Sequence, residues 1–122
     1  MAARPKAVVI DDETLVAATL RDIVETLGTE VVGVAHAYDE GLRLIEGQPG
    51  CDYAFIDLKL GRDLSGVQLA QRAVELGMKV IAVTGFPRLP DGLEGAALLT
   101  KPFSVEAVRL VLDMLRPRGA GS

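Results

Sequence analysis

Five short apolar runs, each four to six residues long and most of them rich in β-branched residues, alternate along this chain with segments of helical periodicity. Runs of this kind are typical of strands that are covered on both faces of a sheet. Strands that alternate with helices predict a parallel sheet with right-handed crossovers. We therefore expect an α/β fold with helices on both faces of a doubly wound five-stranded parallel sheet, its strands covering residues 6–10, 30–35, 52–56, 79–83 and 96–99.

Apolar residues near a spacing of 3.6 predict helices between the strands and after the last one. The predicted helices cover residues 14–27, 39–46, 66–76 and 104–116. Ser104 is a good N-cap for the last of them. In the first helix the apolar residues that recur near this spacing are Leu15, Ala18, Leu20, Ile23 and Leu27, with Leu20 fitting it less well.

The connection between the fourth and fifth strands differs from the others. Between Thr84 and Ala96 the chain reads GFPRLPDGLEG, with two prolines and three glycines in eleven residues. These residues disfavour an ordinary three-turn helix. We expect a loop with at most one or two helical turns, so that the fourth crossover helix is short or missing.

Length and composition exclude several classes of protein. A chain of 122 residues fits one domain, and we expect a core over about 6–116 with a flexible tail at 117–122. The net charge of −4 and the lack of a basic run argue against nucleic acid as a partner. No apolar run approaches the ~18 residues of a membrane helix, so we expect a soluble cytoplasmic protein. The lone Cys51 cannot form an internal disulfide, and we expect it to be buried or half-buried.

Polar residues of a particular kind stand where the apolar runs stop. They are Asp11 and Asp12, Asp57, Thr84, and Lys101. Because the carboxyl ends of parallel strands share one edge of a sheet, these side chains are predicted to converge. Carboxylates crowded within ~4 Å repel by about 4 kcal/mol per pair, and a divalent cation relieves that repulsion. Ligands that are all oxygen suit Mg²⁺, with Mn²⁺ as the alternative.

A carboxylate in such a site can also act as a nucleophile towards phosphorus and form an aspartyl phosphate. In that case Lys101 would pair with the transferred phosphoryl oxygens, and Thr84 would offer them a hydroxyl hydrogen bond. Each residue alone has a structural alternative: for example, Asp12 or Thr14 could cap the first helix. His36, also near a strand end, is predicted to be a surface or capping residue rather than a ligand.

Four motifs carry a resemblance to a known family. DDE at 11–13, Asp57 in FIDLKL, Thr84-Gly85 and Lys101-Pro102-Phe103, in this order, resemble the receiver domain of two-component response regulators over essentially the whole chain. The resemblance implies a flavodoxin-like sheet of order 2-1-3-4-5. It also implies that a histidine kinase or histidine phosphotransfer protein phosphorylates Asp57 in the presence of Mg²⁺.

The same resemblance implies finer roles at the site. Asp12 would bind the metal directly, Asp11 directly or through water, and Lys59 through its backbone carbonyl. The bond between Lys101 and Pro102 would be cis, an isomer that costs an X-Pro peptide only about 0.5–1 kcal/mol. The protein would catalyse only its own phosphorylation and dephosphorylation and would not be an enzyme with a diffusible substrate.

The sequence also departs from the usual receiver pattern. Leu98 stands where receivers commonly carry an aromatic switch residue, and only 17 positions separate Thr84 from Lys101. Gly61 stands where a proline is often found. These traits, with Phe86 after Thr84-Gly85, resemble the FAT GUY subgroup of stand-alone receivers. The residues of the predicted switch region are Gly85, Phe86, Leu98 and Pro102.

Function beyond phosphate acceptance is expected to pass through protein partners, because these residues contain no DNA-binding or enzymatic output domain. The signal would leave by protein contact or onward phosphotransfer, from a monomer or a phosphorylation-dependent dimer. One alternative is a receiver-fold interaction module that does not accept phosphate, which would be expected to lack Asp12, Asp57 or Lys101. Another is a phosphohydrolase of the haloacid-dehalogenase type, but its D-x-D pair is replaced here by DDE at 11–13.

Overall fold

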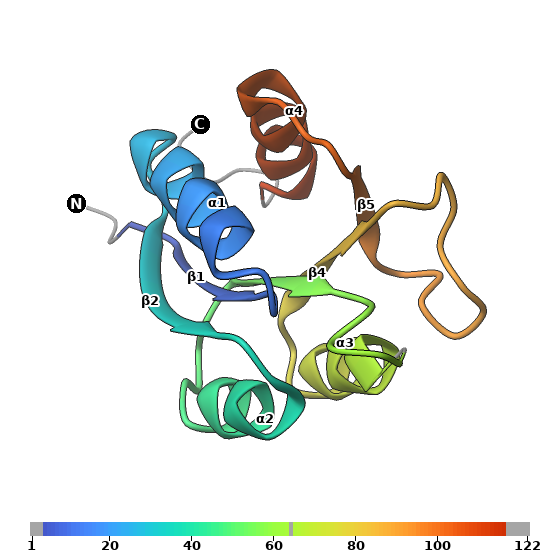
Figure 1. Cartoon of the computed structure of the whole chain (residues 1–122). Helices are drawn as coiled ribbons and strands as arrows, with labels where there is room; N and C mark the ends of the chain where they lie inside the picture. Colours follow the sequence, from blue (N-terminus) through green and yellow to red (C-terminus); the bar gives the residue numbers. More distant parts are fainter. Residues whose placement is uncertain (1–3, 64, 117–122) are drawn as a thin grey trace.

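The computed structural model describes residues 4–63 and 65–116, which form a five-stranded parallel sheet and four helices (Figure 1). The strand order is β2-β1-β3-β4-β5, and every neighbouring pair is parallel. This confirms the predicted flavodoxin-like fold. The elements are β1 (Lys6–Ile10), α1 (Thr14–Thr26), β2 (Glu30–Ala35), α2 (Tyr38–Glu46), β3 (Tyr53–Asp57), α3 (Ser65–Glu75), β4 (Lys79–Thr84), β5 (Ala97–Thr100) and α4 (Val105–Leu115).

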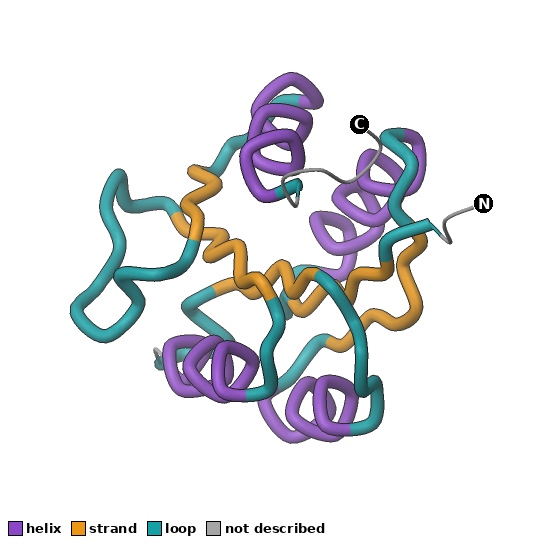
Figure 2. Tube along the Cα trace, turned by 180° about the vertical axis from the view of Figure 1, so that it is seen from behind, coloured by secondary structure: helices purple, strands orange, loops and turns teal. Residues whose placement is uncertain are grey.

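The sheet separates two layers of core. Helices α1 and α4 cover one face, and α2 and α3 cover the other (Figures 1 and 2). In the central strand β3 all five residues are buried. Phe55 packs in the layer of α1 and α4, whereas its neighbours Ala54 and Ile56 pack in the layer of α2 and α3. This alternation explains why β3 is an unbroken apolar run: both of its faces are covered.

Helix α1 forms as predicted, but the apolar residues that indicated it do not all face the core. The structure buries Ala17, Leu20 and Val24, whereas Leu15 is 79% exposed. Apolar residues occupy more than one side of this helix, so periodicity alone allowed two neighbouring stripes. Leu15 belongs to the first turn of α1, beyond Ile10, the last paired residue of β1. Its side chain is therefore left in solvent.

No helix forms in residues 85–96, all of which the structure describes. The connection is a series of turns that projects beside β5 (Figure 1). Leu93, only 1% exposed, packs in the same core layer as α3 together with the half-buried Leu89. A turn closed by the N–H of Ala96 and the carbonyl of Leu93, 3.0 Å apart, leads the chain into β5. The expectation of a missing crossover helix is therefore confirmed.

The element ends agree with the prediction to within one or two residues. Strands β3 and β4 extend one residue further than predicted, so Asp57 and Thr84 are their last residues. Ser104 is the N-cap of α4, and its hydroxyl accepts the N–H of Ala107 at 3.1 Å. Cys51 is buried, as expected. The flexible tail predicted for residues 117–122 lies outside the described residues, and none of the helices within them is long and apolar enough to cross a membrane.

Candidate functional site

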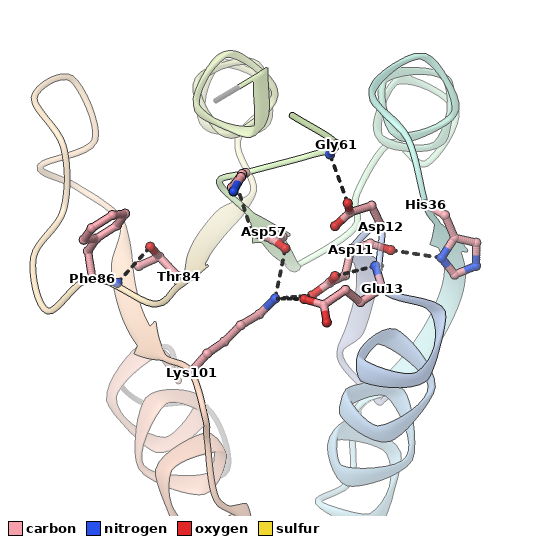
Figure 3. A network of polar contacts seen from close by, with 10 residues as sticks. Asp11, Asp12, Glu13, His36, Asp57, Gly61, Thr84, Phe86 and Lys101 are labelled. Carbon is pink, nitrogen blue, oxygen red and sulfur yellow. Dashed lines mark hydrogen bonds and ion pairs between the residues drawn. The ribbon is translucent and has the colours of Figure 1, made fainter. Parts of the chain in front are cut away.

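The carboxyl edge of the sheet brings one ammonium group against three carboxylates (Figure 3). The Lys101 Nζ lies 2.9 Å from Asp57 Oδ2, 3.0 Å from Asp11 Oδ2 and 3.3 Å from Glu13 Oε1. Lys101 follows β5, Asp57 ends β3, and Asp11 and Glu13 follow β1. They meet because the carboxyl ends of the parallel strands share one edge of the sheet, as predicted. The Lys101 N–H donates to the Thr84 carbonyl at 2.8 Å, and the Lys101-Pro102 peptide is cis, as predicted.

The acids also form a cluster that could hold a metal ion. Carboxylate oxygens of Asp11, Asp12, Glu13 and Asp57 all lie within 4.8 Å of one another. The Oδ2 atom of Asp11 is buried, and its partner among the described residues is the Lys101 ammonium, 3.0 Å away. Four carboxylates at one place, with those of Asp11 and Asp57 buried, form a site made only of oxygen ligands, which fits a divalent cation such as Mg²⁺ or Mn²⁺. Glu13 was not among the predicted ligands.

Backbone N–H groups fix the orientation of each predicted metal ligand. Oδ1 of Asp11 accepts the Glu13 N–H at 2.9 Å, and Oδ1 of Asp57 accepts the Lys59 N–H at 3.0 Å. Asp12 reaches across to the loop after β3, where its Oδ2 accepts the Gly61 N–H at 3.0 Å. Asp12 therefore caps no helix: the N-cap residue of α1 is Glu13, whose side chain makes no capping bond. Lys59 lies at the site through its N–H, and the role of its carbonyl stays a prediction.

Thr84 lies at the same edge but apart from the acids. Its Oγ1 accepts the N–H of Phe86 at 3.2 Å, and no hydrogen bond among the described residues joins it to a carboxylate. The Thr84 side chain stands on the β4 side of Asp57 (Figure 3). The Phe86 ring is 69% exposed, and Leu98 is half-buried opposite Ala82 in the β4–β5 register. The switching role predicted for Gly85, Phe86, Leu98 and Pro102 stays a prediction.

Burial and neighbouring charges shift the pKa values of two groups in the site. Burial raises the pKa of Asp11 above its ordinary value, and the nearby Asp57 charge adds to that effect. Burial alone would lower the pKa of Lys101, but its hydrogen bonds and charge interactions with Asp57 and Asp11 outweigh burial and raise that pKa. Lys101 is therefore a permanent cation here. It offsets the repulsion between the two buried carboxylates.

A glycine that the sequence did not single out for function sets how closely α3 approaches Asp57. A Cβ atom built on Gly66 would overlap the carbonyl oxygen of Asp57 and lie 2.6 Å from the Cα of Leu58. Only a residue without a side chain lets the first turn of α3 lie against the end of β3. The sequence held one signal for this, a glycine at the start of a helix that directly follows the Asp57 loop.

His36 is a second residue whose place the sequence did not predict. Its Nδ1 lies 3.0 Å from the backbone carbonyl oxygen of Asp11 (Figure 3). The residue is half-buried, and the expectation that it is not a metal ligand stays a prediction. The available signal was its position directly after β2, the strand that neighbours β1.

Comparison with known proteins places this fold and site in a family. A family model described as the response regulator receiver domain matches residues 7–113. The chain is 28% identical over 109 residues to the phyllosphere-induced regulator PhyR of Methylorubrum extorquens, a match that covers 86% of this chain and 41% of that protein. The chain thus spans less than half the length of this relative. Membership of the FAT GUY subgroup stays a prediction.

Two solved structures support the same placement. The crystal structure of the response regulator PhyR from Brucella abortus is 32% identical with a TM-score of 0.79, and the match covers 93% of this chain and 48% of that one. A CheY-like receiver domain protein from Methanospirillum hungatei is 31% identical with a TM-score of 0.76, covering 96% of this chain and all of that one. This chain belongs to the response-regulator receiver domain family.

Proposed function

We propose that this receiver accepts a phosphoryl group on Asp57 from a phosphohistidine of a histidine kinase or a histidine phosphotransfer protein. The observation that carries the proposal is the Asp57 carboxylate, buried at the end of β3 with Lys101 Nζ 2.9 Å away and the acids of β1 beside it. One Asp57 oxygen forms a bond to phosphorus while the bond between phosphorus and the donor imidazole nitrogen breaks. The electron pair stays on that nitrogen, which regains a proton from solvent.

Charge compensation is the main task of the neighbouring residues, because an anionic carboxylate must approach an anionic phosphoryl group. Asp11, Asp12 and Asp57 would hold Mg²⁺, which when bound offsets this repulsion. The Lys101 ammonium already lies 2.9 Å from Asp57 Oδ2 and would pair with a phosphoryl oxygen. The Thr84 hydroxyl accepts from Phe86, so its own proton is free to be donated to another phosphoryl oxygen.

The alternatives explain this arrangement less well. An interaction module that does not accept phosphate has no need for Asp12, Asp57 and Lys101 together, yet the chain has all three, with Lys101 against Asp57 and Asp12 in the same acidic cluster. We do not assign the chain an activity on a diffusible substrate. Its catalysis is limited to its own phosphorylation and dephosphorylation.

The output is proposed to be a protein contact or onward phosphotransfer. Nucleic acid and membranes are not proposed partners, because the net charge is −4 and the sequence has no basic run. The protein would act as a monomer or as a phosphorylation-dependent dimer. The cytoplasmic location stays a prediction from the sequence.

Incubation with a small acyl-phosphate donor and Mg²⁺, followed by intact mass measurement, tests the proposal. We expect the wild-type chain to gain one phosphoryl group and Asp57→Asn to gain none. Asp52→Asn is the matched control, since Asp52 lies next to the opposite end of β3 and its carboxylate accepts the Lys6 N–H at 2.8 Å. No gain in the wild type would refute the proposal. An equal gain in Asp57→Asn would place the phosphate on another residue.

A further inference from the structure

The peptide that joins the two adjacent acids is held by the end of β2. On its amino side, the Asp11 N–H donates to the Ala35 carbonyl at 3.0 Å. On its carboxyl side, the Asp11 carbonyl accepts from His36 Nδ1, also at 3.0 Å. Ala35, the last residue of β2, and His36, which follows it, thus bind the N–H and the carbonyl of Asp11.

This geometry bears directly on the direction of the two carboxylates. The Asp11 carbonyl and the Asp12 N–H belong to one planar peptide group. A hydrogen bond to that carbonyl fixes the rotation of the peptide plane, and therefore the angle at which the Asp12 side chain leaves the backbone relative to that of Asp11. The other backbone bonds nearby lie on either side of this peptide: the Asp11 N–H donates to Ala35, and the Glu13 carbonyl accepts the N–H of Ala17.

His36 is half-buried, and its backbone is held by α2. Its backbone N–H donates to Glu40 Oε1 at 2.6 Å, and Glu40 belongs to the first turn of α2. Because the partner of Nδ1 is a carbonyl oxygen, Nδ1 must carry the hydrogen. The imidazole therefore acts as a donor to the turn that carries the acids (Figure 3), while the backbone of the same residue is bonded to α2.

We propose that His36 is a positioning residue for the metal site, acting through the Asp11 carbonyl and touching neither metal nor phosphate. The inference rests on the proposed function, because it requires Mg²⁺ at Asp11 and Asp12. Groups that orient metal ligands contribute about 10-fold or more to metal affinity in other proteins. Loss of the His36 donor should therefore weaken Mg²⁺ binding and leave the chemistry of a fully loaded site intact.

Two substitutions separate the hydrogen bond from the bulk of the ring. His36→Leu keeps a branched side chain of similar reach and removes the donor. His36→Asn places an amide nitrogen on the same Cγ atom that carries Nδ1, and so restores the donor. Calorimetric titration of the whole chain with Mg²⁺, without any phosphodonor, should give a dissociation constant about 10-fold weaker for His36→Leu. His36→Asn should stay close to the wild type.

A kinetic measurement distinguishes positioning from general damage. In phosphorylation by a small acyl phosphate, His36→Leu should need more Mg²⁺ for half-maximal rate and reach the wild-type rate at saturation. Asp52→Ala is the structural control, because it removes the acceptor of the Lys6 N–H at the opposite end of β1. It should lower stability without changing the dissociation constant for Mg²⁺.

The outcomes are distinct. A wild-type dissociation constant in His36→Leu, or an equal loss in His36→Asn, would overturn the positioning role and leave the proposed function standing. Absence of Mg²⁺ binding by the wild-type chain, or binding that survives in Asp12→Ala, would overturn the metal site and the positioning role with it. If His36→Leu does not fold, His36→Ala supplies the same comparison.

Discussion

Lys101 contacts the carboxylates of Asp11 and Asp57, and a bound metal ion would use the same two carboxylates as ligands. Its ammonium lies 3.0 Å from Asp11 Oδ2 and 2.9 Å from Asp57 Oδ2, so in the arrangement described here it is the cation that offsets the two buried carboxylates. A bound Mg²⁺ would share that task. The residue therefore links the stability of the fold to the chemistry of the site.

Removal of the ammonium should make stability depend on Mg²⁺. Lys101→Ala leaves Asp11 and Asp57 facing each other without a cation, and we expect a loss of about 2 kcal/mol in the free energy of unfolding. Mg²⁺ should restore more stability to this variant than to the wild type, because it no longer competes with an ammonium. Urea unfolding with and without Mg²⁺ measures both quantities.

The control for this prediction is Lys79→Ala. Lys79 Nζ donates to the Leu115 carbonyl at 2.7 Å and makes no contact with the acids. It should lose some stability and gain the wild-type increment from Mg²⁺. An identical Mg²⁺ increment in Lys101→Ala would mean that the ammonium and the metal do not compete.

At the residue scale, some site residues could be predicted from the sequence and others could not. Asp11, Asp57 and Lys101 stand at strand ends, and parallel-sheet geometry alone brings strand ends together. His36 and Gly66 act through contacts with backbone atoms of other elements. The sequence holds only the position of each residue as a signal for such a contact, because any backbone can supply the partner.

At the element scale, the start of α3 and the end of β3 form one close contact on which the direction of Asp57 depends. We expect Gly66→Ala to cost about 2 kcal/mol, since the new methyl group must displace the Asp57 carbonyl or the whole helix. Urea unfolding checks the cost. Gly95→Ala is the matched control, because a Cβ there meets nothing within 4 Å. Equal stabilities of the two variants would contradict the close packing.

The sequence predicted the presence of helices and strands better than it predicted which side of each helix packs against the core. Strands were predictable because both faces of β3 and β4 are covered, which requires continuous apolar runs. The core face of α1 was not, because a helix with apolar residues on two sides fits the sheet in more than one rotation. Only the packing against the sheet and α4 decides that Leu20 is inside and Leu15 outside.

The connection between β4 and β5 is the element on which transmission of the signal should depend. It starts beside Thr84 and is attached to the core mainly through Leu89 and Leu93. A helix in this place would be held by its own hydrogen bonds, whereas these turns have few. We expect a phosphoryl mimic at Asp57 to draw Thr84 inward and change amide signals throughout residues 85–99.

Comparison of amide spectra with and without the mimic tests this expectation. Asp57→Asn serves as the control, because it should show no change with the same reagent. Changes confined to the immediate neighbours of Asp57, with none in residues 85–99, would contradict a role for this connection. In that case the signal would have to leave the site through another element.

At the scale of the whole molecule, the two edges of the sheet have different properties. The carboxyl edge carries the acids and Lys101. The amino edge carries Cys51, whose Sγ lies 3.4 Å from the Lys6 carbonyl oxygen and 3.5 Å from that of Tyr53, so its one S–H can donate to either. Strands β1 and β3 run between the edges, and both lie in the middle of the sheet. Any event that opens these strands affects both edges together.

Cys51 therefore offers a measure of whether metal binding stabilises the whole fold. Burial raises the pKa of its thiol, so the fraction of reactive thiolate in the folded protein is below that of a free cysteine at every pH. Alkylation should proceed through opened molecules. Since the chain has one cysteine, the rate reports that opening alone. We expect Mg²⁺ to slow alkylation by a factor of one plus its concentration over its dissociation constant.

The measurement is the alkylation rate under native conditions as Mg²⁺ is raised, with Asp12→Ala as the control that should not respond. If the alkylation rate of the wild type does not change with the Mg²⁺ concentration, Cys51 is exposed by local opening of the amino edge. The sheet would then not open as a unit. A rate that falls as expected would mean that the sheet and the helices that cover it unfold together. Binding of Mg²⁺ at the carboxyl edge would then control how often Cys51 at the amino edge is exposed.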